Sequence, residues 1–198
     1  MEFRDPHDGE MNTSDMPHTR GEAGSPLAER KQGFVSEPAK PDISYVTGSS
    51  KFNYRVSAVI IRGESILAMR DERSPYYYLP GGRVKLNETA EDAVLRELRE
   101  ELGVSARIER PLWLDQSFFR EDVDGLHYHE LCIYFLIDAN GTGLMESGEE
   151  FTLREREHTH RFEWLPFAEL REKYFYPLFL KEEIFSLPER FTLRTDFE

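Results

Sequence analysis

The sequence predicts an α+β fold in which a mixed β-sheet and helices pack together as a sandwich. β-rich segments stand on both sides of one amphipathic helical segment, residues 89–102, and shorter helical patterns follow the last β-rich segment. An amphipathic helix has to bury its apolar stripe against another layer, which here is the sheet. Hydrophobic residues make up 39% of the 198 residues, and few large ones stand before residue 50, so the core is expected after it.

The first fifty residues are rich in Pro, Gly, Ser and charge and show no helical or strand periodicity. Such a segment buries too little apolar surface to offset its ordering entropy. We therefore expect residues 1–50 to form a disordered or loosely ordered tail and residues 51–198 to form the domain with a C-terminal helical segment. The alternative is a pair of short elements around residues 25–32, packed on the domain or on a partner subunit.

The domain is expected to open with a β-hairpin. Residues 54–61 are rich in β-branched and aromatic side chains, residues 62–65 supply turn chemistry, and residues 66–70 give the returning strand. Residues 76–79 are expected to form another short strand, ended by the Pro-Gly-Gly break at residues 80–82.

Residues 89–102 give the clearest helical pattern in the chain. Thr89, followed three residues later by Asp92, is a variant of the capping box, and Gly103 is a typical C-terminal stop. The apolar side chains that repeat at helical spacing, and so predict the buried stripe, are Ala90, Val94, Leu98 and Leu102.

Further strands are expected after the helix, at residues 104–119 with a break at Pro111, at residues 126–137 and within residues 151–164. Polar, glycine-containing loops at residues 121–125 and 140–148 connect them. Short helices are expected at residues 166–170 and 177–185.

Charge and cysteine content limit the possible partners and compartment. The chain has 38 acidic and 25 basic residues, a net charge of −13, which makes a long nucleic acid an unlikely partner. Small phosphorylated substrates stay compatible if a divalent cation supplies positive charge, although acidity can also serve solubility alone. One cysteine, Cys132, and the lack of a secretory pattern or an apolar span favour a soluble, cytoplasmic protein without membrane contact.

Three acids of the helical segment share one face. At helical spacing, Glu97 and Glu101 lie about 40° apart around the axis, and Glu100 lies about 60° from Glu97 on the other side. Like charges at this spacing repel, so something has to offset them. On spacing alone, a solvated acidic face is the simpler interpretation, and a bound divalent cation such as Mg²⁺ is the alternative.

The order of residues around this face carries a family resemblance. Gly82 is followed after five residues by Glu88, and after seven more by the run Arg-Glu-Leu-Arg-Glu-Glu-Leu-Gly-Val at residues 96–104. This segment resembles the Nudix box of the Nudix hydrolases at every defining position. The Leu-Pro-Gly-Gly run at residues 79–82 and the Trp-Leu-Pro run at residues 164–166 are also similar to the family's flanking elements.

The resemblance implies a Nudix-type α/β/α sandwich and a metal-dependent active site. It would place Mg²⁺, with Mn²⁺ as a possible substitute, on Glu97, Glu100 and Glu101, with the Gly82 carbonyl as a further ligand. It would make Glu88 and Arg96 a structural ion pair that orients the loop on the helix.

The expected reaction is the attack of water on a phosphorus of a diphosphate. A general base is needed within hydrogen-bond reach of that water. Glu97 is one candidate. An acid from a loop outside the box is another, and we favour Glu157 among Glu149, Glu150, Glu155 and Glu157, as base or as extra metal ligand, although each could be an exposed strand-edge acid.

Other side chains are candidates for substrate binding. Arg70 could meet a phosphate, and Tyr78 could stack on a base, although an exposed arginine and a core tyrosine are equally ordinary; strand alternation places Tyr77 on the opposite face from Tyr76 and Tyr78. The four histidines spaced i,i+2 in the expected strands, which could form a zinc site but more commonly serve structural or surface roles, are His127, His129, His158 and His160.

The leading hypothesis is a Nudix pyrophosphohydrolase acting on a nucleoside diphosphate linked to another moiety, such as a dinucleotide, nucleotide sugar, ADP-ribose or nucleoside triphosphate. Rival hypotheses are a non-nucleotide diphosphate or a capped RNA as substrate, and a non-catalytic Nudix module that binds a nucleotide as a sensor. The sequence leaves open the substrate, the general base, the role of the tail and a possible homodimer.

Overall fold

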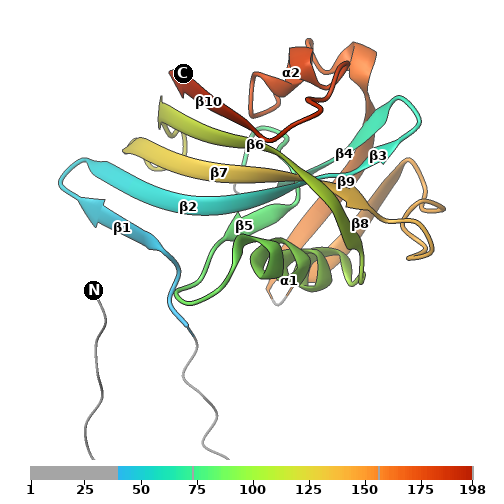
Figure 1. Cartoon of the computed structure of the whole chain (residues 1–198), viewed down its shortest axis with the longest axis horizontal. Helices are drawn as coiled ribbons and strands as arrows, with labels where there is room; N and C mark the ends of the chain where they lie inside the picture. Colours follow the sequence, from blue (N-terminus) through green and yellow to red (C-terminus); the bar gives the residue numbers. More distant parts are fainter. Residues whose placement is uncertain (1–39, 73, 156, 198) are drawn as a thin grey trace, which may run out of the picture. The chain divides into compact units, whose positions relative to one another are not determined.

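The computed structural model describes residues 40–72, 74–155 and 157–197 and places them in two β-sheets, with α1 on one outer side and α2 on the other (Figure 1). The elements are β1 (Ser44–Thr47), β2 (Ser50–Val59), β3 (Ile61–Arg62), β4 (Ser65–Asp71), β5 (Gly81–Arg83), α1 (Ala90–Leu102), β6 (Arg107–Arg120), β7 (His127–Asp138), β8 (Glu150–Glu155), β9 (His158–Pro166), a 3₁₀ turn (Phe167–Glu169), α2 (Leu180–Glu183) and β10 (Thr192–Phe197). The expected α+β class is confirmed.

The larger sheet has the order β1-β2-β7-β6-β10, with β5 paired to β2, and the smaller one has the order β3-β4-β9-β8. Two neighbouring pairs, β2 with β7 and β6 with β10, run parallel, and the other pairs are antiparallel. The sheet is therefore mixed, as expected. No helix in the described part of the chain is long and apolar enough to cross a membrane.

Strand β2 is buried on both faces and separates two parts of the core. Val56 and Ala58 pack in the cluster that contains α1, whereas Val59 packs in the cluster on the side of α2. A strand with two covered faces carries an almost continuous apolar run instead of strict alternation. This explains why residues 56–61 are mostly aliphatic.

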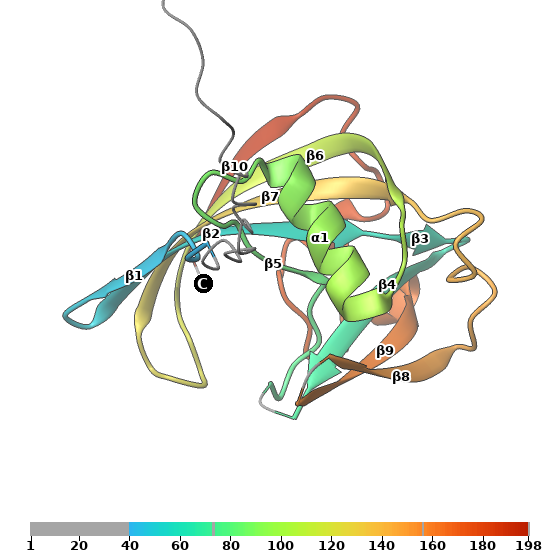
Figure 2. The same ribbon diagram turned by 90° about the horizontal axis from the view of Figure 1, so that it is seen from below.

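Helix α1 forms as the sequence predicts. The Thr89 hydroxyl accepts a hydrogen bond from the backbone N–H of Asp92, and Gly103 ends the helix in the left-handed conformation with φ of 69°. The four side chains of the expected stripe are all buried, and they belong to the first core cluster, which also contains residues of β2, β4 and β9. Seen from below in Figure 2, α1 lies across the larger sheet beside β5. The helix glutamates lie beside this stripe and not opposite it, because Glu101 is buried and Glu97 is half-buried, whereas Glu100 is exposed.

The structure differs from the expectation in the first half of the chain. β1 lies inside the range assigned to the tail and pairs with β2, while residues 1–39 lie outside the described residues. The prediction of a strand at residues 76–79 was wrong, since Tyr77 and Tyr78 form only isolated β-bridges. The Gly-Gly break instead contains β5, because the backbone of β2 offers it a pairing edge.

The second half differs as well. The single strand expected within residues 151–164 is two strands, β8 and β9, joined in a hairpin. Pro111 does not end β6, because register shifts on either side of it let the pairing with β7 continue. The helix expected at residues 177–185 shortens to α2, and β10, which the sequence pattern did not predict, adds a parallel edge strand beside β6.

Candidate active site

A cavity of about 600 Å³ takes residues from both sheets, from α1 and from the loop between β6 and β7. Its lining includes Glu97 and Glu101 of α1, Gly81 and Gly82 of β5, Asn53, Arg55 and Ser57 of β2, Glu130 and Tyr134 of β7, Asp71 of β4, His158 and His160 of β9, and residues 119–124. Acids, cations and aromatic rings are therefore combined in one hollow. Glu97 and Glu101 are the two helix glutamates in its lining, and Glu100 is exposed outside it.

Glu101 fixes the turn before β5 to the helix. Its side chain is buried, at 7% relative exposure, and its Oε2 accepts a hydrogen bond of 2.9 Å from the backbone N–H of Gly81. A buried carboxylate needs such partners, because leaving it unpaired is costly. The interaction holds the Gly81–Gly82 turn directly over the acidic face of α1.

Glu97 lies against the backbone of Gly82. A Cβ atom built on Gly82 would lie 2.2 Å from Glu97 Oε1, so the glycine leaves the space that the carboxylate occupies. Burial raises the pKa of Glu97, and the hydrogen bond from Arg96 at 2.7 Å opposes that rise. Glu97 is therefore an acid whose proton affinity is increased inside the cavity.

Arg96 contacts the other acids around the loop. It forms two hydrogen bonds with Glu88, of 2.7 and 3.0 Å, and one of 3.2 Å with Glu100. It also donates to the carbonyl of Arg83. Fork-shaped contacts of this kind with a carboxylate fix orientation as well as charge. The ion pair of Glu88 and Arg96 thus joins the loop before α1 to the middle of the helix.

The donor set suits a hard divalent cation by its chemistry, with three carboxylates beside a glycine turn whose Cβ position is already filled by Glu97. In residues 40–72, 74–155 and 157–197, however, no three His, Cys, Asp or Glu side chains are arranged as they stand to hold a metal ion. Glu97 and Glu100 instead accept hydrogen bonds from Arg96, and Glu101 accepts one from Gly81. The residues fit a cation if Arg96 gives way.

The other residues singled out in the sequence are divided between the cavity and the surface. Tyr78 lines the cavity, and Tyr77 lies on the opposite side, where its ring stacks under the guanidinium of Arg70 at 5.0 Å. Arg70 is not part of the cavity lining. Glu157 is exposed in the turn between β8 and β9 and does not line the cavity either.

The four histidines do not gather at one point. His129 stacks on Phe118 with ring centroids 4.4 Å apart, and His127 is exposed. His158 and His160 line the cavity on the side of β9. Among the other acids named before Trp164, Glu149 pairs with Arg62 and Glu150 pairs with Arg161, which ties both to the surface of the smaller sheet.

Arg55 and Glu130 are among the cavity residues that sequence reasoning missed. Both stand in strands whose neighbouring side chains are largely apolar, and a charged residue in such a strand is the signal that was available. They meet because β2 and β7 pair in parallel, which no local pattern predicts.

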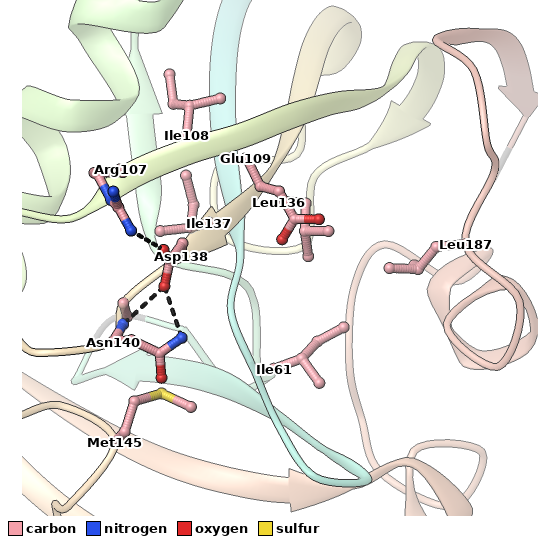
Figure 3. Close-up of a pocket in the computed structure, with 11 residues that line it drawn as sticks. Ile61, Arg107, Ile108, Glu109, Leu136, Ile137, Asp138, Asn140, Met145 and Leu187 are labelled. Carbon is pink, nitrogen blue, oxygen red and sulfur yellow. Dashed lines mark hydrogen bonds and ion pairs between the residues drawn. The ribbon is translucent and has the colours of Figure 1, made fainter.

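A second hollow, of about 620 Å³, lies between the start of β6, the end of β7 and the loop after it (Figure 3). Three of its polar side chains pair with one another, because Asp138 accepts hydrogen bonds from Arg107 at 2.6 Å and from the side chain of Asn140 at 2.8 Å. Ile61, Met145 and Leu187 supply apolar surface. None of the α1 glutamates reaches it, so it is not the candidate active site.

The fold and the box of glutamates define a class of protein, and comparison with known families gives the same class. The family model described as the NUDIX domain matches residues 51–182. The chain therefore belongs to the Nudix family.

Two curated relatives and one solved structure illustrate the similarity. The ADP-ribose pyrophosphatase of Methanocaldococcus jannaschii is 31% identical over 98 residues, covering 48% of this chain and 55% of that protein. The isopentenyl-diphosphate Delta-isomerase of Cereibacter sphaeroides is 33% identical over 92 residues, covering 42% and 50%. The chain thus spans about half the length of these curated relatives.

Among solved structures, a mutator MutT protein from Bacillus halodurans superposes with a TM-score of 0.52 at 13% identity, covering 73% of this chain and 89% of that chain. At this identity the likeness concerns the fold alone. It agrees with the sandwich described above.

Proposed function

We propose that the chain is a Mg²⁺-dependent pyrophosphohydrolase that cleaves the phosphoanhydride bond of a nucleoside diphosphate linked to another moiety. The observation that carries the proposal is the shared position of Glu97 and Glu101 on a cavity that also holds cationic and aromatic side chains. The similarity to the ADP-ribose pyrophosphatase of Methanocaldococcus jannaschii supports the same class of substrate.

Glu97, Glu100 and Glu101, with the Gly82 carbonyl, are the groups proposed to hold the cation, with Mn²⁺ as a substitute. When bound, the cation supplies charge neutralisation for the diphosphate and a lowered pKa for the attacking water. For this to happen, Arg96 has to release its hydrogen bonds with Glu97 and Glu100. Its paired hydrogen bonds with Glu88 keep the guanidinium in place meanwhile.

Glu97 is proposed as the group that takes the proton from water. It lines the cavity with only 13% of its side chain exposed, and burial raises its pKa, which brings a carboxylate closer to the proton affinity that a base needs near neutral pH. Glu157, the other acid considered for this role, is exposed outside the cavity lining.

The proposed place for the nucleoside is the aromatic part of the cavity. Its rings are those of Tyr76, Tyr78, Phe119, Tyr128, Tyr134 and Tyr176. Flat rings bind bases by stacking, with each good contact contributing about 1–3 kcal/mol in single-stranded nucleic-acid sites. Tyr78 is the stacking residue that the sequence already suggested.

A second candidate function is a non-catalytic nucleotide-binding or sensor module. The pairing of Glu97 and Glu100 with Arg96 favours it, because part of the negative charge is already offset without a metal ion. The similarity to an isopentenyl-diphosphate Delta-isomerase also favours a non-nucleotide diphosphate as the substrate. A cytoplasmic location and a homodimer remain part of the proposal, and the net charge of −13 argues against nucleic acid as the substrate.

The test is a panel of dinucleotides, nucleotide sugars, ADP-ribose, nucleoside triphosphates and isopentenyl diphosphate, assayed for products with and without Mg²⁺. The double variant Glu100→Gln and Glu101→Gln should lose Mg²⁺-dependent turnover on whichever compound the wild type cleaves. The matched control is Glu91→Gln with Glu109→Gln, which removes the same charge from exposed positions. Unchanged turnover in the first variant would exclude the catalytic role, and binding without turnover by the wild type would favour the sensor.

A further inference from the structure

Arg55 places a guanidinium on the floor of the cavity. It stands in β2 between Tyr54 and Val56, lines the cavity, and leaves 25% of its side chain exposed. A charged group in a strand that is otherwise largely buried loses hydration, and this costs free energy unless a partner compensates it. The compensation present in the structure is incomplete.

The nearest acid to Arg55 is Glu130, but the two do not form a hydrogen bond. Arg55 Nε lies 3.9 Å from Glu130 Oε2, which is beyond hydrogen-bond distance. Across residues 40–72, 74–155 and 157–197, no hydrogen bond from the guanidinium of Arg55 is found. A guanidinium carries five N–H donors, and those of Arg55, which lines the cavity, have no hydrogen-bond acceptor in the described part of the chain. A negatively charged ligand would supply the missing acceptors.

Glu130 is held away from Arg55 by its own partner. The side-chain amide of Asn53 donates to Glu130 Oε2 at 3.1 Å, and the amide oxygen of Asn53 accepts from Ser44 at 2.6 Å and from Arg83 at 3.3 Å. These contacts fix the orientation of the amide of Asn53, which is 1% exposed. Glu130 therefore provides charge near Arg55 without filling its donors.

The helix glutamates act on Arg55 as well. Burial tends to lower the pKa of the Arg55 guanidinium, but the negative charges of Glu130, Glu101 and Glu97 more than offset it, and the net pKa is raised. The guanidinium thus stays charged while lying within electrostatic reach of the proposed metal site. Strand register agrees, because Arg55 pairs with Arg83 and the next residue, Val56, pairs with Gly82.

We propose that Arg55 contacts the phosphate of the substrate that the metal site does not hold, and that Glu130 and Asn53 position its guanidinium for this. The inference rests on the proposed function, since it presumes a substrate with two linked phosphates. A planar guanidinium matches two phosphate oxygens at once, which a lysine ammonium cannot do. Arg55 would then distinguish diphosphates from monophosphates, and Arg70, which lies outside the cavity lining, would not.

The experiment uses the full chain with Mg²⁺ and two probes, α,β-methylene-ADP, whose bridge resists hydrolysis, and AMP. Binding of each is measured by calorimetry for wild type, Arg55→Gln, Arg55→Lys and a control, Arg107→Gln, whose side chain is 80% exposed outside the cavity. Arg55→Gln should weaken the binding of α,β-methylene-ADP by about 10- to 100-fold and should weaken the binding of AMP much less. Arg55→Lys should recover part of the loss, and Arg107→Gln should match the wild type.

Mg²⁺ binding without nucleotide separates a direct role from a structural one. Removing a positive charge close to Glu97 and Glu101 should leave Mg²⁺ affinity unchanged or tighter, and thermal melting should show that the variants fold. An equal loss of affinity for both probes, or a loss of Mg²⁺ affinity in Arg55→Gln, would overturn the proposed role of Arg55. If the wild type bound neither probe and cleaved no diphosphate, the proposed function itself would fail. Wild-type turnover with unchanged probe binding in Arg55→Gln would overturn this inference alone.

Discussion

The carboxylate of Glu97 occupies the space where a side chain of Gly82 would begin, with Oε1 only 2.2 Å from that Cβ position. The clash would involve the far end of a flexible side chain, so Gly82→Ala should displace Glu97 more than it destabilises the fold. We expect turnover to fall on the order of 100-fold, as for other small misplacements of a reacting group. The free energy of unfolding should change by less than about 1 kcal/mol. Steady-state kinetics and urea unfolding of the same variant check both parts.

Gly81→Ala is the matched change with the opposite expected result. Gly81 has φ of 145°, a conformation that side chains disfavour, and its Cβ would lie 2.2 Å from the backbone oxygen of Val56. Backbone cannot move aside as a side chain can, so we expect a loss of about 2 kcal/mol or more in the free energy of unfolding. Urea denaturation measures it. A stability equal to that of Gly82→Ala would contradict this account of the turn.

Two single variants, Glu97→Gln and Glu157→Gln, test which acid takes the proton from the attacking water. Glu97 lies in the cavity, so its replacement should lower kcat by about 10² to 10⁴-fold at saturating Mg²⁺. Glu157 is exposed in the turn between β8 and β9, so its replacement should leave kcat close to that of the wild type. The reverse order of the two effects would assign the base to the loop.

Asp115 should make the stability of the protein depend on pH. It is 1% exposed, and burial, with Asp196 nearby, raises its pKa to about 6. Its unfolded pKa is about 3.9, so between those values the folded state binds more protons, and stability falls as pH rises through that window. Asp115→Asn cannot lose a proton and should be more stable than the wild type at pH 7.5 by about 2–3 kcal/mol.

The difference should shrink as the pH falls towards 4 and disappear below about pH 3, where the carboxyl of Asp115 is protonated in both states. Asp138→Asn serves as the control of opposite sign, because backbone and Arg107 hydrogen bonds lower the pKa of Asp138. Its replacement should remove stability at neutral pH instead of adding it. Urea unfolding across pH 4–8 distinguishes the two.

Glu88→Gln tests the contacts that Arg96 makes with the loop. Arg96 hydrogen bonds are the main cause of the lowered pKa of Glu88, which is 12% exposed, and the Lys85 backbone N–H adds a third donor. Loss of the charge should cost about 1–3 kcal/mol at pH 7. Because the folded pKa is lowered, the difference from the wild type should shrink as pH falls below about 4.3, the unfolded value.

The sequence predicted what depends on local pattern. Helix α1 is determined by the cap at Thr89, the apolar stripe and the stop at Gly103, which all lie within one short stretch of the chain. The strand β10 was missed because most of its side chains are exposed and its pairing with β6 joins residues far apart in the chain. The hairpin of β8 and β9 was read as one strand, since the turn between them lacks glycine and proline.

The candidate site divides in the same way. Glu97, Glu100 and Glu101 were singled out because they follow one another on a single helix. Arg55 and Glu130 were not, because they come from strands brought together only by the parallel pairing of β2 with β7. Arg70 lies near the end of β4, and Glu157 lies in the turn between β8 and β9. Whether a residue at the end of a strand faces a cavity depends on how the two sheets pack together.

Arg96 acts as a counter-ion that the chain carries within itself. Because its guanidinium contacts Glu88, Glu97 and Glu100 together, the acidic face of α1 is neutralised in part without any external ion. We therefore expect the domain to fold in a metal-poor medium. Binding of the proposed Mg²⁺ would then exchange one cation for another in a structure that is already folded, and we expect chelators to inactivate the protein without unfolding it.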